Sequence, residues 1–123
     1  MAYNDMEVIA YKILKFLYEC MKQGITPTKE DLIRECNLDK FPESYWCKVV
    51  AELIDKRYIK GFSQLKCKGG TYIQMNDDIS VTFDGVRFLE DNSKMKEVKD
   101  FLGSAFEIAL QQGLNIIKAS MPG

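Results

Sequence analysis

The stretch TKEDLIRECNLDKFPESYWCKVVAELIDKRYIKG, residues 28–61, carries the clearest structural signal in the chain. Thr28 with Asp31 three residues later has the pattern of a capping box at the start of a short helix. Asn37 tolerates the left-handed conformation that ends a helix, and Pro42 suits the first turn of the next one. A short capped helix, a tight connection and a longer helix are typical of a helix-turn-helix.

The longer helix of this stretch has one apolar and one polar side. Its apolar arc consists of Trp46, Val49, Val50, Leu53 and Ile54. At 100° per residue the opposite side carries Ser44, Tyr45, Lys48, Glu52 and Asp55. We therefore expect Trp46 to be buried between this helix and the first helix of the chain.

The flanking segments complete a winged helix. A first helix begins with an Asn4–Glu7 capping pattern, repeats apolar residues every three or four positions and stops at Gly24. A hairpin follows, with one strand near 58–65, a turn at 66–70 and a returning strand at 71–75, interrupted at 76–78 and resumed at 79–81. Thr82 then caps a short helix that ends near Asn92. The fold predicted is α+β and mostly α, a winged helix with an extra long C-terminal helix.

That last helix is expected to begin at Ser93 and reach about Lys118. We therefore divide the chain into a winged-helix domain, 1–92, and a C-terminal amphipathic helix, 93–123. One side of the helix carries Met95, Val98, Leu102, Ala105, Phe106, Ala109, Gly113, Ile116 and Ile117. This stripe is wider than the short preceding helix can cover, which predicts a homodimer held by these residues. The alternative is that the helix folds back across the first helix of the same chain.

The segment ISVTFDGVRFLEDNS, residues 79–93, resembles the closing segment of the YjcQ-like family, small proteins of bacteria and phages. The resemblance rests on a strand followed by Thr82, Gly85, Phe88-Leu89-Glu90 and Asn92-Ser93, and continues upstream in residues 56–61. It covers nearly the whole chain and implies a winged-helix fold in a bacterial or prophage setting. It brings no catalytic residues. The Asn76–Asp78 interruption and the long last helix depart from the family pattern.

Composition narrows the classes of function. The 123 residues suit one domain, and 17 basic against 18 acidic residues mean that any nucleic-acid contact must come from a local patch. The start of the chain lacks a signal-peptide pattern, and the apolar stretch 101–117 is too short and polar to span a bilayer. Four scattered cysteines and no histidine favour reduced thiols in the cytoplasm over a metal site. Without histidine, a nucleophile motif or a phosphate loop, we expect no enzyme and no cofactor.

Two functions remain open. As a DNA-binding regulator, the protein would use Ser44, Tyr45, Lys48, Lys56, Arg57, Lys60, Lys66 and Lys68 on double-stranded DNA. Residues 56–70 hold five basic side chains and no acid, although lysines on a hairpin also serve simply as a solvated edge. Residues 28–57 carry seven acids against six bases, with Glu52 and Asp55 beside the candidate readers. The alternative is a protein-interaction module of phage or prophage origin, which binds another phage or host protein.

Overall fold

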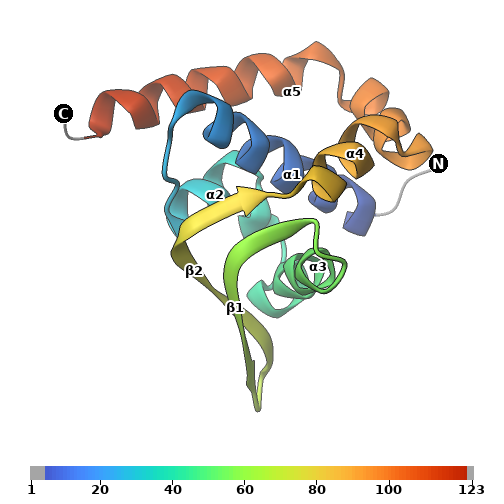
Figure 1. Ribbon diagram of the computed structural model, residues 1–123, viewed down its shortest axis with the longest axis vertical. Helices are drawn as coiled ribbons and strands as arrows, with labels where there is room; N and C mark the ends of the chain where they lie inside the picture. Colours follow the sequence, from blue (N-terminus) through green and yellow to red (C-terminus); the bar gives the residue numbers. More distant parts are fainter. Residues whose placement is uncertain (1–4, 122–123) are drawn as a thin grey trace.

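The computed structural model describes residues 5–121, and its elements follow the predicted winged-helix order (Figure 1). The elements are α1 (Asp5–Gln23), α2 (Lys29–Glu35), the 3₁₀ helix η1 (Leu38–Lys40), α3 (Glu43–Asp55), β1 (Ile59–Cys67), β2 (Gly70–Val81), α4 (Phe83–Asp91) and α5 (Ser93–Ser120). Helix α1 lies in the middle of the molecule, with α5 on one side and with α2, α3 and the hairpin on the other (Figure 1).

The helix boundaries in the first half of the chain follow the predicted caps. Thr28 Oγ1 accepts a hydrogen bond from the Asp31 amide at 3.1 Å, and the Asp31 carboxylate accepts one from the Thr28 amide at 3.0 Å. This confirms the capping box. Asn37 has a left-handed φ of 56°, but it leads into η1, which the sequence did not reveal. Pro42 directly precedes α3, as expected, whereas the pattern at Asn4 lies outside the described residues.

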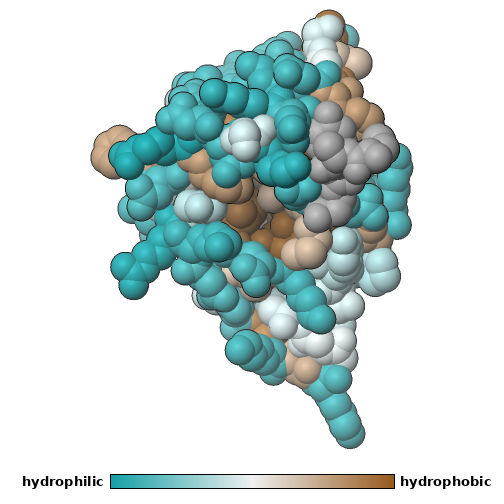
Figure 2. Space-filling model, turned by 90° about the vertical axis from the view of Figure 1, so that its right-hand side faces the viewer, coloured by the Kyte–Doolittle hydropathy of each residue, from teal (hydrophilic) through white to brown (hydrophobic). Residues whose placement is uncertain are grey.

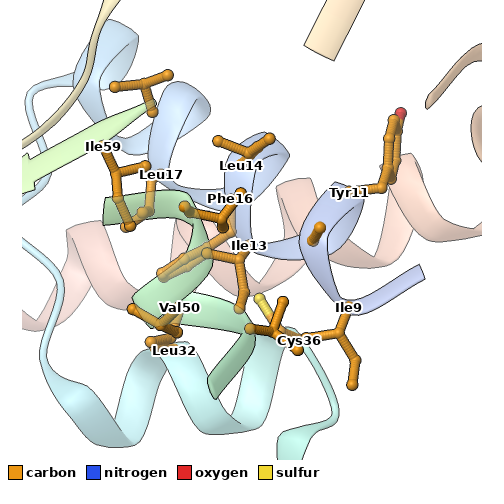
Figure 3. Close-up of a cluster of buried hydrophobic side chains, with 14 of the residues drawn as sticks. Ile9, Tyr11, Ile13, Leu14, Phe16, Leu17, Leu32, Cys36, Val50 and Ile59 are labelled. Atoms are coloured by element: carbon orange, nitrogen blue, oxygen red, sulfur yellow. The ribbon is translucent and has the colours of Figure 1, made fainter. Parts of the chain in front are cut away.

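The core forms around α1, which buries residues on several of its sides (Figure 3). Leu32 of α2, Val50 of α3 and Ile59 of β1 meet this helix in the same cluster (Figure 3). Trp46 is 2% exposed, so the prediction that it is buried is confirmed. Burial of a large aromatic side chain in such a cluster stabilises the fold by several kcal/mol, on the order of 3–5 for truncation to alanine.

The hairpin follows the prediction only in part. β2 is assigned as one strand from Gly70 to Val81 and pairs antiparallel with β1, but its residues 76–79 have no partner on β1, so the expected interruption at 76–78 is confirmed as a break in the pairing. A register shift between Lys60 and Phe62 absorbs the extra residues as a bulge. Gly61 makes this possible with φ +91°, since a β-carbon there would lie 2.6 Å from the Ile79 Cα. The turn is also shorter than expected, because β1 continues to Cys67 and β2 resumes at Gly70.

A close junction ties the end of α3 to the start of α4. Thr82 Oγ1 accepts from the Gly85 amide at 3.0 Å and donates to the Arg57 carbonyl at 2.6 Å. The Thr82 amide donates to the Tyr58 carbonyl at 2.9 Å, and the Tyr58 ring stacks on Phe88 with centroids 4.6 Å apart. Gly85 lies against the Tyr58 carbonyl, where no β-carbon fits. The motif that suggested the family is therefore a structural junction.

Helix α5 packs against α1 in the same chain. Its N-cap is Asn92, whose side chain accepts from the Lys94 and Met95 amides, so the cap predicted at Ser93 is wrong by one residue. A kink at Gly103, with φ 67°, divides the helix. At Gly113 the Glu35 carboxylate of α2 occupies the space of a β-carbon. Gly103 thus bends the helix, and Gly113 admits a close approach of α2, both within one chain.

The residues predicted for a dimer interface fall into three groups. Met95, Val98 and Ile117 are buried inside the chain and can contact a second copy only if α5 leaves its present site. Leu102, Phe106 and Gly113 are partly buried, whereas Ala105, Ala109 and Ile116 are exposed. Most of the predicted stripe is therefore covered within the chain, and the homodimer stays a prediction that can use only the exposed members of the stripe, Ala105, Ala109 and Ile116.

Among residues 5–121, no helix combines the length and the apolar character needed to cross a bilayer.

The junction yields a first prediction. Replacing Gly85 with alanine puts a β-carbon 2.7 Å from Val81 Cγ1 and 2.9 Å from the Tyr58 carbonyl carbon. Such overpacking against backbone should lower the free energy of unfolding by about 2 kcal/mol, even after the gain in helix propensity. Thermal unfolding should show a melting temperature lower by about 8 °C. Arg87→Ala, an exposed change on the same helix, serves as the control and should change stability by less than about 0.5 kcal/mol.

Candidate nucleic-acid interface

The outward face of α3 carries the residues predicted to read DNA. Lys48, Glu52 and Asp55 are exposed, and Ser44 and Tyr45 are partly buried. The Tyr45 ring packs on Phe41 with centroids 5.5 Å apart, which leaves its orientation fixed by the preceding loop. This face therefore offers hydroxyl, ammonium and carboxylate groups in one row along the helix.

The hairpin lies alongside α3. Gln64 Nε2 of β1 donates to Asp55 Oδ1 at 2.9 Å near the C-terminal end of the helix. Near its N-terminal end, a β-carbon at Gly70 would approach the Ser44 Cβ to 3.1 Å. Because side chains alternate along a strand, Lys66 points to the same side of the hairpin as Gln64, toward α3. The hairpin and the helix thus form one continuous surface.

Two groups of cations occupy opposite ends of this surface. The first, called here the helix-end cations, consists of Lys56, Arg57 and Lys60. The second, the turn cations, consists of Lys66 and Lys68 beside the N-terminal end of α3. All five are exposed, and neither they nor Lys48 form an ion pair with another residue in the described part of the chain. A 13-residue helix separates the two groups, which corresponds to about 20 Å.

Several acids of the helix-turn-helix are neutralised internally. Lys29 Nζ lies 2.6 Å from the Glu43 carboxylate, and Arg34 contacts Asp31 at 2.8 Å and Glu35 at 3.1 Å. Desolvation of the Asp31 carboxyl raises its pKa, but hydrogen bonds from the Thr28 amide and from Arg34 outweigh this effect. The pKa of Asp31 is therefore below its usual value. The exposed carboxylates on the α3 face are Glu52 and Asp55, and Asp55 already accepts from Gln64. These pairs use bases as well as acids, so the net charge of residues 28–57 is unchanged, but the acids that they involve lie away from the α3 face.

An apolar hollow of about 320 Å³ borders α3 from the other side. Figure 2 looks onto this side of the molecule and shows apolar residues at the bottom of a depression edged by polar ones. Its lining includes Val49 and Leu53 of α3, Phe88 of α4 and Met95 of α5. Glu52 and Lys56 also border it, so the hollow adjoins the C-terminal half of the candidate interface.

Three of the four cysteines lie away from this surface, in the core. Cys20, Cys36 and Cys47 are buried, while Cys67 in the hairpin is exposed. Burial raises the pKa of the Cys20 thiol to about 12, and it also raises that of Cys36, so both stay protonated at neutral pH. Within residues 5–121, no three His, Cys, Asp or Glu side chains gather in a way that could hold a metal ion.

Comparison with known proteins identifies the family. The YjcQ protein family matches residues 11–104 of the chain. The chain belongs to the YjcQ family. Neither the curated proteins nor the solved structures contain a significant match.

The YjcQ match covers the whole candidate interface. It runs from α1 through α3, both hairpin strands and α4, and it ends one residue after the Gly103 kink in α5. Both cation groups and the Thr82–Gly85 junction thus lie in the part shared with the YjcQ family. The helical segment 105–120 lies outside the matched range.

Sequence reasoning missed the contacts that join the hairpin to α3. Gln64, Gly70 and Ile73 carry no charge or motif that marks them, yet Gln64 anchors Asp55 and the Ile73 backbone lies within hydrogen-bond reach of Cys47. The only available signal was the alternation of β1, which puts Gln64 and Lys66 on one face. The structure therefore adds the relation between the two cation groups, which the linear sequence does not contain.

Arg57 gives a second prediction. It has φ 62°, and its amide donates to the Ile54 carbonyl at 2.9 Å while the Tyr58 amide donates to Leu53, so it occupies the left-handed position that ends α3. Arg57→Gly should relieve about 1–2 kcal/mol of backbone strain, less the higher entropy of glycine in the unfolded chain. We expect a net gain of about 0.5–1 kcal/mol in chemical denaturation. Arg57→Ala, which removes the same charge but keeps the strain, should give no such gain.

Proposed function

We propose that this YjcQ-family protein binds double-stranded DNA and acts as a transcriptional regulator in a bacterial or prophage setting. The observation that carries the proposal is the placement of unpaired cations at both ends of α3, with the hairpin alongside the helix. Reduced, mostly buried thiols suit action in the cytoplasm. The proposed role is binding, without catalysis or a cofactor.

The dimensions of the surface support this function. The major groove of DNA is about 12 Å wide and admits an α-helix. Cation groups about 20 Å apart along α3 can reach phosphates on both sides of the groove that the helix enters. The helix-end cations would contact one strand of the backbone and the turn cations the other. Since these contacts address phosphates, they supply affinity without sequence preference.

Base contacts would come from the middle of the α3 face. Ser44, Tyr45 and Lys48 offer a hydroxyl, a phenol and an ammonium group, of which lysine pairs well with guanine. Glu52 can accept from cytosine N4, and the amide of Gln64 already satisfies Asp55. Glu52 and Asp55 would be repelled by phosphates. They therefore restrict binding to DNA sequences and orientations in which neither carboxylate lies beside the backbone.

A protein-interaction module is the second candidate. It is favoured by the carboxylates on the outward face of α3 and by large apolar side chains left exposed elsewhere, such as Phe83 at 88% and Leu65 at 45%. A protein partner would show binding that depends little on salt, because few counterions are released. The same salt titration therefore separates the two functions.

The third prediction tests the phosphate contacts. Lys66→Ala combined with Lys68→Ala should weaken binding to every duplex alike and reduce the slope of log K against log salt by about two. Fluorescence anisotropy with labelled duplexes of unrelated sequence, measured at several salt concentrations, gives the slope. The single variant Arg57→Gly removes one cation and stabilises the fold, and it should lower the slope by about one. A lower slope in a more stable variant shows that the loss reflects charge and not unfolding.

The matched control removes two lysines from α5, Lys94→Ala with Lys118→Ala, and should keep the wild-type slope. An unchanged slope in the Lys66/Lys68 variant, or equal losses in both double variants, would contradict the proposed surface. Absence of any duplex binding at low salt would leave the interaction module as the function.

A further inference from the structure

The face of α5 that points away from α1 is exposed and uncharged. It consists of Ala105, Ile108, Ala109, Gln112, Ile116 and Ala119, called here the outer face. Ile108 is 58% and Ile116 66% exposed. The charged residues of segment 105–120 are Glu107 and Lys118, which 100° steps place more than 90° away from Gln112. Soluble helices normally carry charges on such a face, so its composition is unusual.

The outer face has the spacing of a helix-pairing seam. Ala105, Ala109, Gln112, Ile116 and Ala119 follow one another at intervals of four, three, four and three residues. This heptad spacing keeps a seam along one side of a helix that pairs with another helix. Three alanines allow the two backbones to come close together. The inward residues Leu110, Leu114 and Ile117 form a separate stripe, already used against the core.

The outer face is also nearly symmetric about Gln112, its central residue. Counting outward from Gln112, the position four residues before is Ile108 and the position four residues after is Ile116. Seven residues before and after are Ala105 and Ala119. In an antiparallel pair with its two-fold axis at Gln112, Ile108 meets Ile116 and Ala105 meets Ala119, while Ala109 meets the exposed, uncharged Asn115. A surface that complements itself under a two-fold rotation favours a second copy over an unrelated partner.

A glutamine at the axis supports the same arrangement. Its side-chain amide both donates and accepts, so two symmetry-related glutamines can bond to each other reciprocally. The molecule contains this interaction already, since Gln23 and Gln111 exchange hydrogen bonds of 2.9 and 3.1 Å. Gln112 is exposed and makes no side-chain hydrogen bond within residues 5–121. A single polar residue in an apolar seam also fixes the register of the pair.

We propose that two copies of this protein associate through the outer face of α5, antiparallel, with the two-fold axis at Gln112. The helical segment involved is about 24 Å long, and pairing would bury about 1,000 Å² in total, at the lower end of specific interfaces. The absence of charge on the face removes like-charge repulsion between the copies. This interface leaves α5 packed on α1, and it does not depend on DNA binding.

Disulfide trapping tests the register. In a Cys67→Ser background, whose three other thiols are buried, Gln112→Cys should form a cross-linked dimer under mild oxidation. Ile108→Cys and Ile116→Cys should not cross-link singly, because each residue lies about 12 Å along the axis from its own symmetry mate, beyond the reach of about 7 Å between α-carbons. The double variant Ile108→Cys with Ile116→Cys should cross-link, since each cysteine faces the other type across the axis.

Sedimentation velocity tests the association itself. The wild-type chain should dimerise reversibly at tens to hundreds of micromolar, the range expected for an interface of this size. Ile108→Glu should raise the dissociation constant at least about tenfold, because it buries a carboxylate against apolar side chains. Its melting temperature should not fall, since Ile108 is exposed in the single chain and glutamate is a good helix former. Lys118→Glu, away from the outer face, is the matched control and should dimerise like the wild type.

Each remaining outcome decides against the proposal. A wild-type chain that stays monomeric at hundreds of micromolar overturns the interface. Equal cross-linking of all three single cysteine variants indicates parallel helices and overturns the register. A dimer that Ile108→Glu leaves intact uses a different surface.

Discussion

The contact between Gly85 and the Tyr58 carbonyl is the constraint on which the positions of the other elements depend. It brings the first turn of α4 directly against the backbone that links α3 to β1, and Thr82 fastens the two with hydrogen bonds to Arg57 and Tyr58. The base of the hairpin, the end of α3 and the start of α4 thereby meet at one point. Only a residue without a β-carbon allows this approach, so the position of the wing relative to α3 depends on a missing methyl group.

The elements on both sides of this junction are positioned by a series of local turns and contacts. The left-handed Arg57 turns the backbone out of α3, β2 bulges opposite Gly61, and the Tyr58 ring stacks on Phe88 of α4. Asn92 then starts α5 immediately after α4, so that Met95 and Val98 fall into the core. Backbone hydrogen bonds hold the turn at Arg57 and Tyr58, and the contacts of Gln64 and Gly70 with α3 keep the hairpin and its cations beside that helix. Such rigidity is what a binding surface on a loop-rich element requires.

The sequence was sufficient for features that depend on neighbours along the chain. The Thr28–Asp31 box, the stop at Gly24 and the apolar arc around Trp46 follow from local hydrogen bonding and helical periodicity, and the structure confirms them. It was insufficient where two local solutions compete or where distant segments meet. Asn92 and Ser93 are both good caps, and the structure uses the first, with Met95 buried behind it. The bulge opposite Gly61 depends on the close approach of the Ile79 backbone, and the cover of the α5 stripe depends on α1. The cations of the candidate site were all visible in the sequence, but their arrangement around α3 required the Gln64 and Gly70 contacts.

The position of α5 has a consequence for any assembly built on it. Helix α1 separates α5 from the hairpin, so the outer face of α5 and the candidate DNA surface lie at opposite poles of the molecule (Figure 1). Two copies joined through α5 would stand back to back, with their wings directed outward and away from each other. They could not occupy neighbouring half-sites on one duplex, as many winged-helix and helix-turn-helix dimers do. The pair would instead hold two separate stretches of DNA, so it would form a loop within one duplex or a bridge between two.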